Sequence, residues 1–157
     1  MSEPKTFVDP STLTPRTSSA YPDIFRARVL PREKRALGDA LGLTKIGVNL
    51  TTLMPGKESA LRHWHTHEDE LVYVLEGELV MVTDAGEERI GPGMCAGFKA
   101  GVPNGHQFVN RGATPVRYLE ISNRHEDDLV AYPDADLDYN KDADGKGRFT
   151  HKDGTPW

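Results

Sequence analysis

A chain of 157 residues, 37% of them hydrophobic, is long enough for one hydrophobic core and too short for two of ordinary size. Its formal charge of −5 is concentrated in residues 126–146, where eight acidic residues stand against two lysines, so a nucleic-acid partner is not expected. The single Cys95 excludes an internal disulfide, and neither a signal peptide nor an apolar run of membrane-spanning length is visible. We therefore expect a cytoplasmic protein with no membrane partner.

The first 43 residues are predicted to be an N-terminal arm and lead-in. Four prolines among serine, threonine and charged residues in segment 1–22 leave too little apolar surface to order that segment by itself. Residues 24–43 combine a short apolar patch with Gly38 and Gly42 and could form at most one broken helical turn. The arm is therefore expected to be extended.

From Thr44 the pattern changes to short apolar alternations separated by turn residues, which predicts strands. The first is expected over 44–50, where Ile46, Val48 and Leu50 share one face. The remaining predicted strands are 60–65, 70–75, 79–83, 88–90, 95–98, 107–110 and 116–122. Evenly spaced short strands without a helix between them indicate an all-β fold, a single antiparallel β-barrel or sandwich over residues 44–124.

Residues 125–157 are predicted to be an irregular, acidic C-terminal tail. Four aromatic residues interrupt its polar sequence: Tyr132, Tyr139, Phe149 and Trp157. So many aromatic side chains are unusual for a disordered segment. We therefore expect part of the tail to pack on the barrel or on a second subunit.

Four of the six histidines lie near the predicted barrel strands, and they suggest a metal site. His63 and His65 are two residues apart on a predicted strand, so their side chains point to the same face. Glu70 follows after one short turn, and His106 begins another strand. Imidazole and carboxylate groups together bind divalent Zn, Fe, Mn or Ni. A surface cluster of histidines is the alternative, but the pairing of two imidazoles behind the apolar Leu61 disfavours it.

These residues resemble the first motif of the cupin superfamily. That motif, a glycine, His-x-His, a glutamate and a second glycine, corresponds here to Gly56, His63 with His65, Glu70 and Gly77, and the first interval is one residue longer than usual. The resemblance covers about residues 44–122 and also includes the second cupin motif. It implies a jelly-roll barrel that holds one divalent metal ion per chain through three histidines and one glutamate.

The second cupin motif matches less closely. Its members here are Gly93, Gly101, His106 and Asn110. Lys99 stands where proline is usual, and four residues separate Gly101 from His106. The Arg-His-Trp-His sequence, the Pro-Asn-Gly-His turn and the C-terminal end resemble a group of small single-domain bacterial cupins.

Other candidate residues carry weaker signals. His67 lies at a predicted turn, where a solvated histidine is the simpler reading. Trp64 faces away from His63 and His65 and is expected to pack on a sheet or subunit. Cys95 is interpreted as a small buried hydrophobe rather than a nucleophile.

Residues 140–145 imitate the start of a calcium-binding loop. His151 stands where that loop requires a glutamate, and no helices are predicted on either side. Asp144 with Gly145, and Asp153 with Gly154, are instead interpreted as turns.

Two functions remain open from the sequence. A metal site with free coordination positions favours a small-molecule metalloenzyme of the oxygenase, isomerase or lyase type. The alternative is a non-catalytic protein that binds a small metabolite or sugar. The residues considered as a general base are Tyr73, Gln107, Tyr118 and Glu120. We also expect a homodimer, because outer-face apolar residues such as Trp64 would otherwise be exposed.

Overall fold

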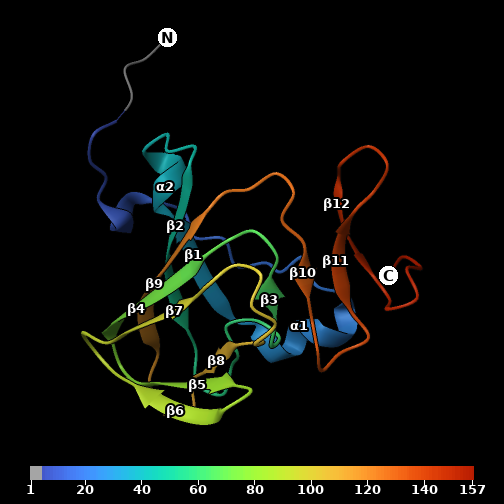
Figure 1. Cartoon of the computed structure of the whole chain (residues 1–157). Helices are drawn as coiled ribbons and strands as arrows, with labels where there is room; N and C mark the ends of the chain where they lie inside the picture. The colour runs from blue at the N-terminus through green and yellow to red at the C-terminus, as the bar shows by residue number, and fades with distance from the viewer. Residues whose placement is uncertain (1–4) are drawn as a thin grey trace.

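The computed structural model describes residues 5–157, so the first four residues of the predicted arm lie outside it. The larger sheet has the order β1 (Arg32–Ala36), β2 (Ile46–Leu53), β9 (Val116–Asn123), β4 (Glu70–Glu76) and β7 (Cys95–Phe98) (Figure 1). The smaller sheet has the order β6 (Gly86–Ile90), β5 (Leu79–Thr83) and β8 (Gln107–Val109). All pairings within both sheets are antiparallel, which confirms the predicted all-β class.

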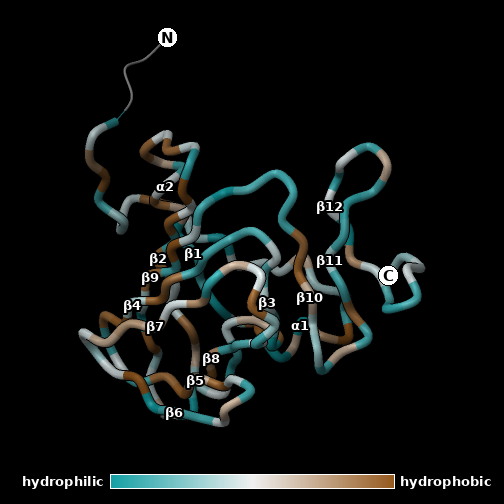
Figure 2. Tube along the Cα trace, viewed as in Figure 1, coloured by the Kyte–Doolittle hydropathy of each residue, from teal (hydrophilic) through white to brown (hydrophobic). Residues whose placement is uncertain are grey.

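The main core lies between these two sheets. Its buried side chains come from both: Leu53, Val72, Val74, Val116 and Tyr118 from the larger sheet, and Leu79, Ile90 and Phe108 from the smaller. Figure 2 shows the hydrophobic stretches on β2 and β9 and the hydrophilic edge strand β6. Burial of these apolar side chains is the dominant favourable contribution to folding.

Strand β4 shows the two-residue alternation that the sequence predicts. Val72 and Val74 are buried and lie opposite Glu120 and Tyr118 of β9, so these four residues belong to the inner face of the larger sheet. The exposed apolar side chains of β4 are those of Leu71, Tyr73 and Leu75. Trp64, by contrast, is only half-buried. The exposed apolar surface that could be covered by a second subunit therefore includes the outer face of β4. The homodimer itself stays a prediction.

Gly77 makes the turn from β4 to β5 possible. Its φ of 80° lies in the left-handed region, which other residues rarely adopt. A Cβ atom at this position would also stand 2.9 Å from Cγ2 of Val116. Both the backbone conformation and the close packing therefore require glycine here.

The lead-in is more structured than expected. It contains a short 3-10 helix (Pro10–Thr12), α1 (Asp23–Val29), the edge strand β1 and α2 (Leu37–Ala40), so the expectation of at most one broken helical turn was wrong. Strand β1 was not predicted because its sequence, Arg-Glu-Lys-Arg-Ala, shows no alternation of apolar residues. Within residues 5–157 no helix is long and apolar enough to cross a membrane.

The C-terminal segment packs on the rest of the fold, as expected, but it does so with strands. β10 (Val130–Ala131), β11 (Asp138–Lys141) and β12 (Gly147–Thr150) form a four-stranded sheet with β3 (Trp64–His65). Tyr132 and Leu137 enter a second buried cluster with Tyr21, Val29 and Leu61, beside α1 (Figure 1). The C-terminal segment therefore packs against β3, which carries the predicted ligand His65.

Candidate metal centre

The four predicted ligands come from three segments that the backbone brings together. His63 precedes β3 and forms a two-way backbone bridge with His106, at N···O distances of 3.1 and 2.9 Å. His65 lies in β3, and Glu70 is the first residue of β4. Strand 60–65 was expected to be continuous, but only Trp64 and His65 of it are in a strand. The bridge, more than strand periodicity, places the two histidine windows side by side.

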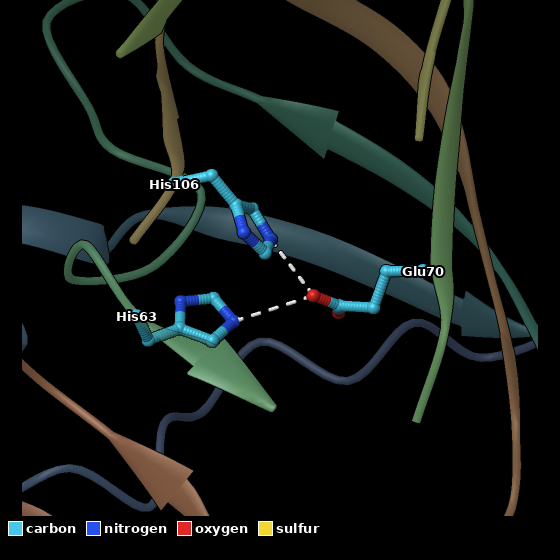
Figure 3. A group of neighbouring side chains, drawn as sticks. All are labelled: His63, Glu70 and His106. Atoms are coloured by element: carbon cyan, nitrogen blue, oxygen red, sulfur yellow. Dashed lines mark ion pairs between the residues drawn. The ribbon is translucent and has the colours of Figure 1, made fainter. Parts of the chain in front are cut away.

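The imidazoles surround one oxygen of the Glu70 carboxylate. The distance to Glu70 Oε2 is 2.7 Å from Nε2 of His106, 3.4 Å from that of His65 and 3.7 Å from that of His63. Figure 3 shows the rings of His63 and His106 pointing toward the same Glu70 oxygen. All four predicted residues thus converge on one point.

The Glu70 oxygen at this point is buried and has no hydrogen bond of normal geometry within the described residues. Buried polar oxygens are almost always satisfied, so an unsatisfied one among three imidazole nitrogens indicates a missing partner. A divalent cation supplies such a partner, because it accepts lone pairs from the nitrogens and the carboxylate alike. The donor set therefore fits a transition metal.

The far side of two rings is held by hydrogen bonds. Nδ1 of His63 lies 2.7 Å from the Leu61 carbonyl oxygen, and Nδ1 of His65 lies 2.6 Å from Oδ2 of Asp128. An Nδ1 that donates a hydrogen bond carries a proton, so in each ring it is Nε2 that faces Glu70 and offers a lone pair when the ring is neutral. Both rings are thereby turned in the direction that metal binding needs.

Asp128 is a site residue that the sequence analysis did not find. It is 9% exposed, and its other oxygen accepts hydrogen bonds from the backbone N–H groups of His67, at 2.8 Å, and Glu68, at 3.1 Å. Its carboxylate therefore fixes His65 against the following turn. In the sequence Asp128 is one acid among eight in the tail, and no local pattern distinguishes it.

The charge states of the cluster follow from its surroundings. Burial raises the pKa of Glu70, but the neighbouring His106 and His63 imidazoles hold that pKa well below its usual range. Burial lowers the pKa of His106, which favours the neutral ring. Burial opposes a charge on His65, yet Glu70 and Asp128 outweigh it and raise its pKa to about 9. Ion binding through His65 would therefore release a proton.

His106 is fixed differently from the other two histidines. The residue is 4% exposed, and its ring stacks on Phe98 with ring centroids 3.5 Å apart and planes 6° apart. Its Nδ1 is buried and has no hydrogen-bond partner within the described residues. Aromatic packing and the backbone bridge to His63, instead of a second hydrogen bond, orient this ring.

Arg62 ties together the loops that carry His63 and His106. Its guanidinium donates to the Gly105 carbonyl at 3.2 Å and to the Asp134 carboxylate at 2.6 and 2.7 Å, and it also contacts Asp84. The Gly105 contact lies next to His106, and Asp134 belongs to the C-terminal segment. The arginine of the Arg-His-Trp-His sequence therefore supports the site without facing it.

The cluster opens into a cavity of about 420 Å³. Its walls include all four predicted ligands, and its other charged wall residues are Arg16, Arg32, Lys34 and Glu120. Of the residues considered as a general base, Glu120 alone lines this cavity. Tyr73 lies on the outer face, Tyr118 is buried in the core, and Gln107 is half-buried outside the cavity wall.

The weaker candidates lie outside the cluster. His67 stacks on His125, with ring centroids 4.8 Å apart, and its Nδ1 lies 2.8 Å from the Thr66 hydroxyl. Cys95 is exposed, so the expectation that it is buried was wrong. Cys95 is the first residue of β7 and lies opposite the outward-facing Tyr73 of β4.

Residues 142–146 form the turn between β11 and β12, and they include the turn at Asp144 and Gly145 that the sequence predicted. Oδ1 of Asp142 accepts hydrogen bonds from the backbone N–H groups of Asp144, at 3.0 Å, and Lys146, at 2.8 Å. Gly145 has a φ of 75°, which suits glycine in such a turn. The Asp142 carboxylate, the first acidic position of the imitated calcium loop, therefore serves the turn.

Comparison with known proteins identifies the family. The model of the cupin domain matches residues 49–122. A solved structure described as a sugar phosphate isomerase from a cupin superfamily, from Silicibacter pomeroyi, is 45% identical, with 96% of each chain covered and a TM-score of 0.90. The chain belongs to the cupin superfamily. No curated protein matches it.

Two further solved structures are similar to this chain at lower sequence identity. A provisionally named sugar phosphate isomerase from Acidithiobacillus ferrooxidans is 31% identical over 80% of each chain, with a TM-score of 0.72. A predicted oxalate decarboxylase from Thermotoga maritima is 22% identical over 76% of this chain and 100% of the other, with a TM-score of 0.61. At that identity the second likeness shows the fold alone.

Proposed function

We propose that this cupin is a metal-dependent isomerase that moves a carbonyl group between neighbouring carbons of a small sugar-like molecule. His63, His65, Glu70 and His106 would hold one divalent transition-metal ion. The observation that carries the proposal is the convergence of three imidazole nitrogens on a buried, unsatisfied Glu70 oxygen at the wall of a cavity. Such a site is built to bind an ion within reach of a ligand.

The donor set leaves room for a substrate at the ion. Four protein donors do not complete the octahedral shell that Fe, Mn and Ni prefer. An ion held there would polarise a carbonyl or hydroxyl oxygen of the bound molecule. The remaining chemistry, proton transfer between two carbons, falls to side chains of the cavity wall.

Glu120 is the proposed general base. It faces Val72 across the β4–β9 pairing, two residues along β4 from Glu70, so both carboxylates lie on the inner face of the sheet. Its Oε2 accepts a 2.6 Å hydrogen bond from Nζ of Lys34. The ionised carboxylate can take the proton from the carbon beside a carbonyl and return it to the former carbonyl carbon. The hydroxyl proton moves in the same direction, from the neighbouring hydroxyl oxygen to the former carbonyl oxygen, which balances the isomerisation.

The relatives support an isomerase over the other reactions of the fold. The two relatives described above as 45% and 31% identical to this chain are both described as sugar phosphate isomerases. The cyclase and decarboxylase structures among its neighbours are at most 22% identical and speak for the fold only. The Glu120 carboxylate on the wall of the same cavity supports the proposal, because an isomerase needs a base near the bound substrate.

The test is proton exchange at carbon. Metal-loaded protein is incubated in D2O with a panel of aldose and ketose phosphates, and NMR follows deuterium entry next to the carbonyl together with product formation. We expect both with at least one member of the panel. Glu120→Gln should slow them about 100-fold or more with the bound metal unchanged, since general-base catalysis contributes that much.

Glu76→Gln is the matched control, because Glu76 is an exposed β4 carboxylate paired with Arg117. It should exchange like the unmodified protein. If every panel member returns without deuterium and bound metabolites are released unchanged, the isomerase proposal is wrong and the non-catalytic binding reading replaces it.

A further inference from the structure

Arg32 is a buried cation that has no counter-charge paired with it in the described part of the chain. The residue is 8% exposed, and within the described residues its side chain makes one hydrogen bond, from Nη1 to the Ser59 carbonyl oxygen, and no ion pair. Its Nε is buried and has no partner. Burying an unpaired charge is unfavourable because the group loses its hydration, so buried arginines are normally paired.

The surrounding charges do not compensate it. Glu120, the acidic wall residue other than the proposed metal ligand, is already bonded to Lys34. Arg16 adds a second guanidinium at the cavity wall, and it forms no ion pair within residues 5–157. Its backbone pairs with that of Lys34 in both directions, at 2.8 and 3.0 Å, which fastens the arm along β1. After the Lys34–Glu120 pair is set aside, this part of the wall carries two positive charges.

Hydroxyl groups complete the lining around these cations. Ser18, Ser19 and Ser59 line the same cavity. The Ser59 hydroxyl oxygen accepts a 3.0 Å hydrogen bond from the Phe108 N–H, which leaves its hydrogen free to donate. Two guanidinium forks with neighbouring hydroxyls offer more donors than one carboxylate can accept. Tetrahedral oxyanions with several free oxygens match such a set better.

We propose that Arg32, with Arg16 at the mouth, forms an oxyanion-binding subsite for the phosphoryl group of the substrate. This inference rests on the proposed function in that the subsite shares the cavity with the candidate metal centre. Arg32 lies on β1 two residues from Lys34, whose side chain reaches Glu120. A molecule whose phosphoryl group lies on Arg32 and whose other end reaches the ion would therefore pass the proposed base. The subsite fixes one end of the substrate, and the ion fixes the other.

The experiment measures inorganic phosphate binding to the metal-loaded protein by calorimetry at constant ionic strength. We expect one phosphate per chain. Arg32→Gln should weaken binding about tenfold or more, because it removes a buried charge-assisted donor. Arg16→Gln should weaken it less, about threefold, because the side chain is exposed to screening. Acetate should bind more weakly than phosphate to the unmodified protein.

Arg35→Gln is the matched control. Arg35 lies on the same strand, points away from the cavity wall and is paired with Glu33 at 2.9 Å. It should bind phosphate like the unmodified protein. A second readout guards against a folding artefact. Without phosphate, the melting temperature of Arg32→Gln should be no lower than that of the unmodified protein, since the substitution removes an uncompensated charge. If Arg32 were only structural, its replacement would lower the melting temperature.

Phosphate binding that survives Arg32→Gln, through direct binding to the ion for example, would overturn the proposal. Absent binding, tighter acetate than phosphate, or a clear loss of melting temperature in Arg32→Gln would also overturn it. The metal content of the arginine variants should stay that of the unmodified protein. A protein that binds phosphate through Arg32 but catalyses no exchange would contradict the isomerase and leave the subsite standing, so the two failures can be told apart.

Discussion

Two regions of the molecule pair histidine with carboxylate, and only one of them has the features of a metal site. In the C-terminal segment Nδ1 of His151 lies 2.7 Å from Oδ2 of Asp136. The other carboxylate oxygen of Asp136 accepts a 2.8 Å hydrogen bond from the backbone N–H of Lys152. The His151 ring stacks on Trp157, with centroids 4.0 Å apart. Each polar group of this exposed pair has a partner in the chain or access to water.

The cavity cluster uses the same residue types in a different state. Three imidazoles face one Glu70 oxygen that is buried and has no hydrogen bond of normal geometry within the described residues. The comparison teaches that residue type is not the deciding feature. A ligand site is distinguished by buried polar atoms that have no hydrogen-bond partner within the protein. Substitutions in the two regions should therefore have unequal effects.

The largest effect should follow a change at Glu70. Glu70→Gln replaces an anionic donor with a neutral amide at nearly the same size, so the attraction for a divalent ion is lost. We expect metal content, measured by elemental analysis, to fall from about one ion per chain to less than about a tenth of that. His67→Ala, a histidine outside the cluster, should retain the ion. Equal metal content in Glu70→Gln and the unmodified protein would refute the assignment.

A smaller effect should follow a change behind the ligands. Asp128→Asn keeps the size of the side chain but weakens its hold on Nδ1 of His65, the 2.6 Å contact. Loss of such an outer partner typically weakens metal binding about 10- to 100-fold. Competition with a chelator of known affinity measures this change. An unaltered affinity would mean that Asp128 only anchors the backbone of the following turn.

The smallest effect should come from the exposed pair. Asp136→Asn should change neither the metal content nor the chelator competition, because Asp136 is 62% exposed and lies in the C-terminal segment away from the cavity wall. Its urea midpoint should stay close to that of the unmodified protein, since exposed ion pairs contribute little. A loss of metal in this variant would show that the comparison between the two regions is wrong.

The sequence predicted the strands of the barrel because their alternation is local. The predicted ranges 79–83 and 95–98 coincide with β5 and β7, and 116–122 with all but the last residue of β9. The same analysis missed β1 and the three C-terminal strands, whose residues are mostly polar. β1 pairs with β2 and β10 pairs with the distant β3, whereas β11 and β12 form a polar hairpin. A local hydrophobic pattern reports none of these pairings.

The site was predictable to the same extent. His63, His65, Glu70 and His106 were found from spacing, and the structure brings them together. Asp128 was not, because it meets His65 across a sequence separation of 63 residues and belongs to an acidic segment. Arg32 also gave no signal: in the sequence it is one cation in a charged stretch, and only its burial sets it apart.

The most direct test is the metal content of the unmodified protein, purified without a chelator and measured by elemental analysis alongside protein concentration. The account predicts about one transition-metal ion per chain, and a rise in melting temperature when Zn, Mn, Ni or Fe is returned to chelator-treated protein. Absence of a stoichiometric ion, together with no thermal shift on adding any of these metals, would contradict the central claim that Glu70 and its three histidines form a metal centre.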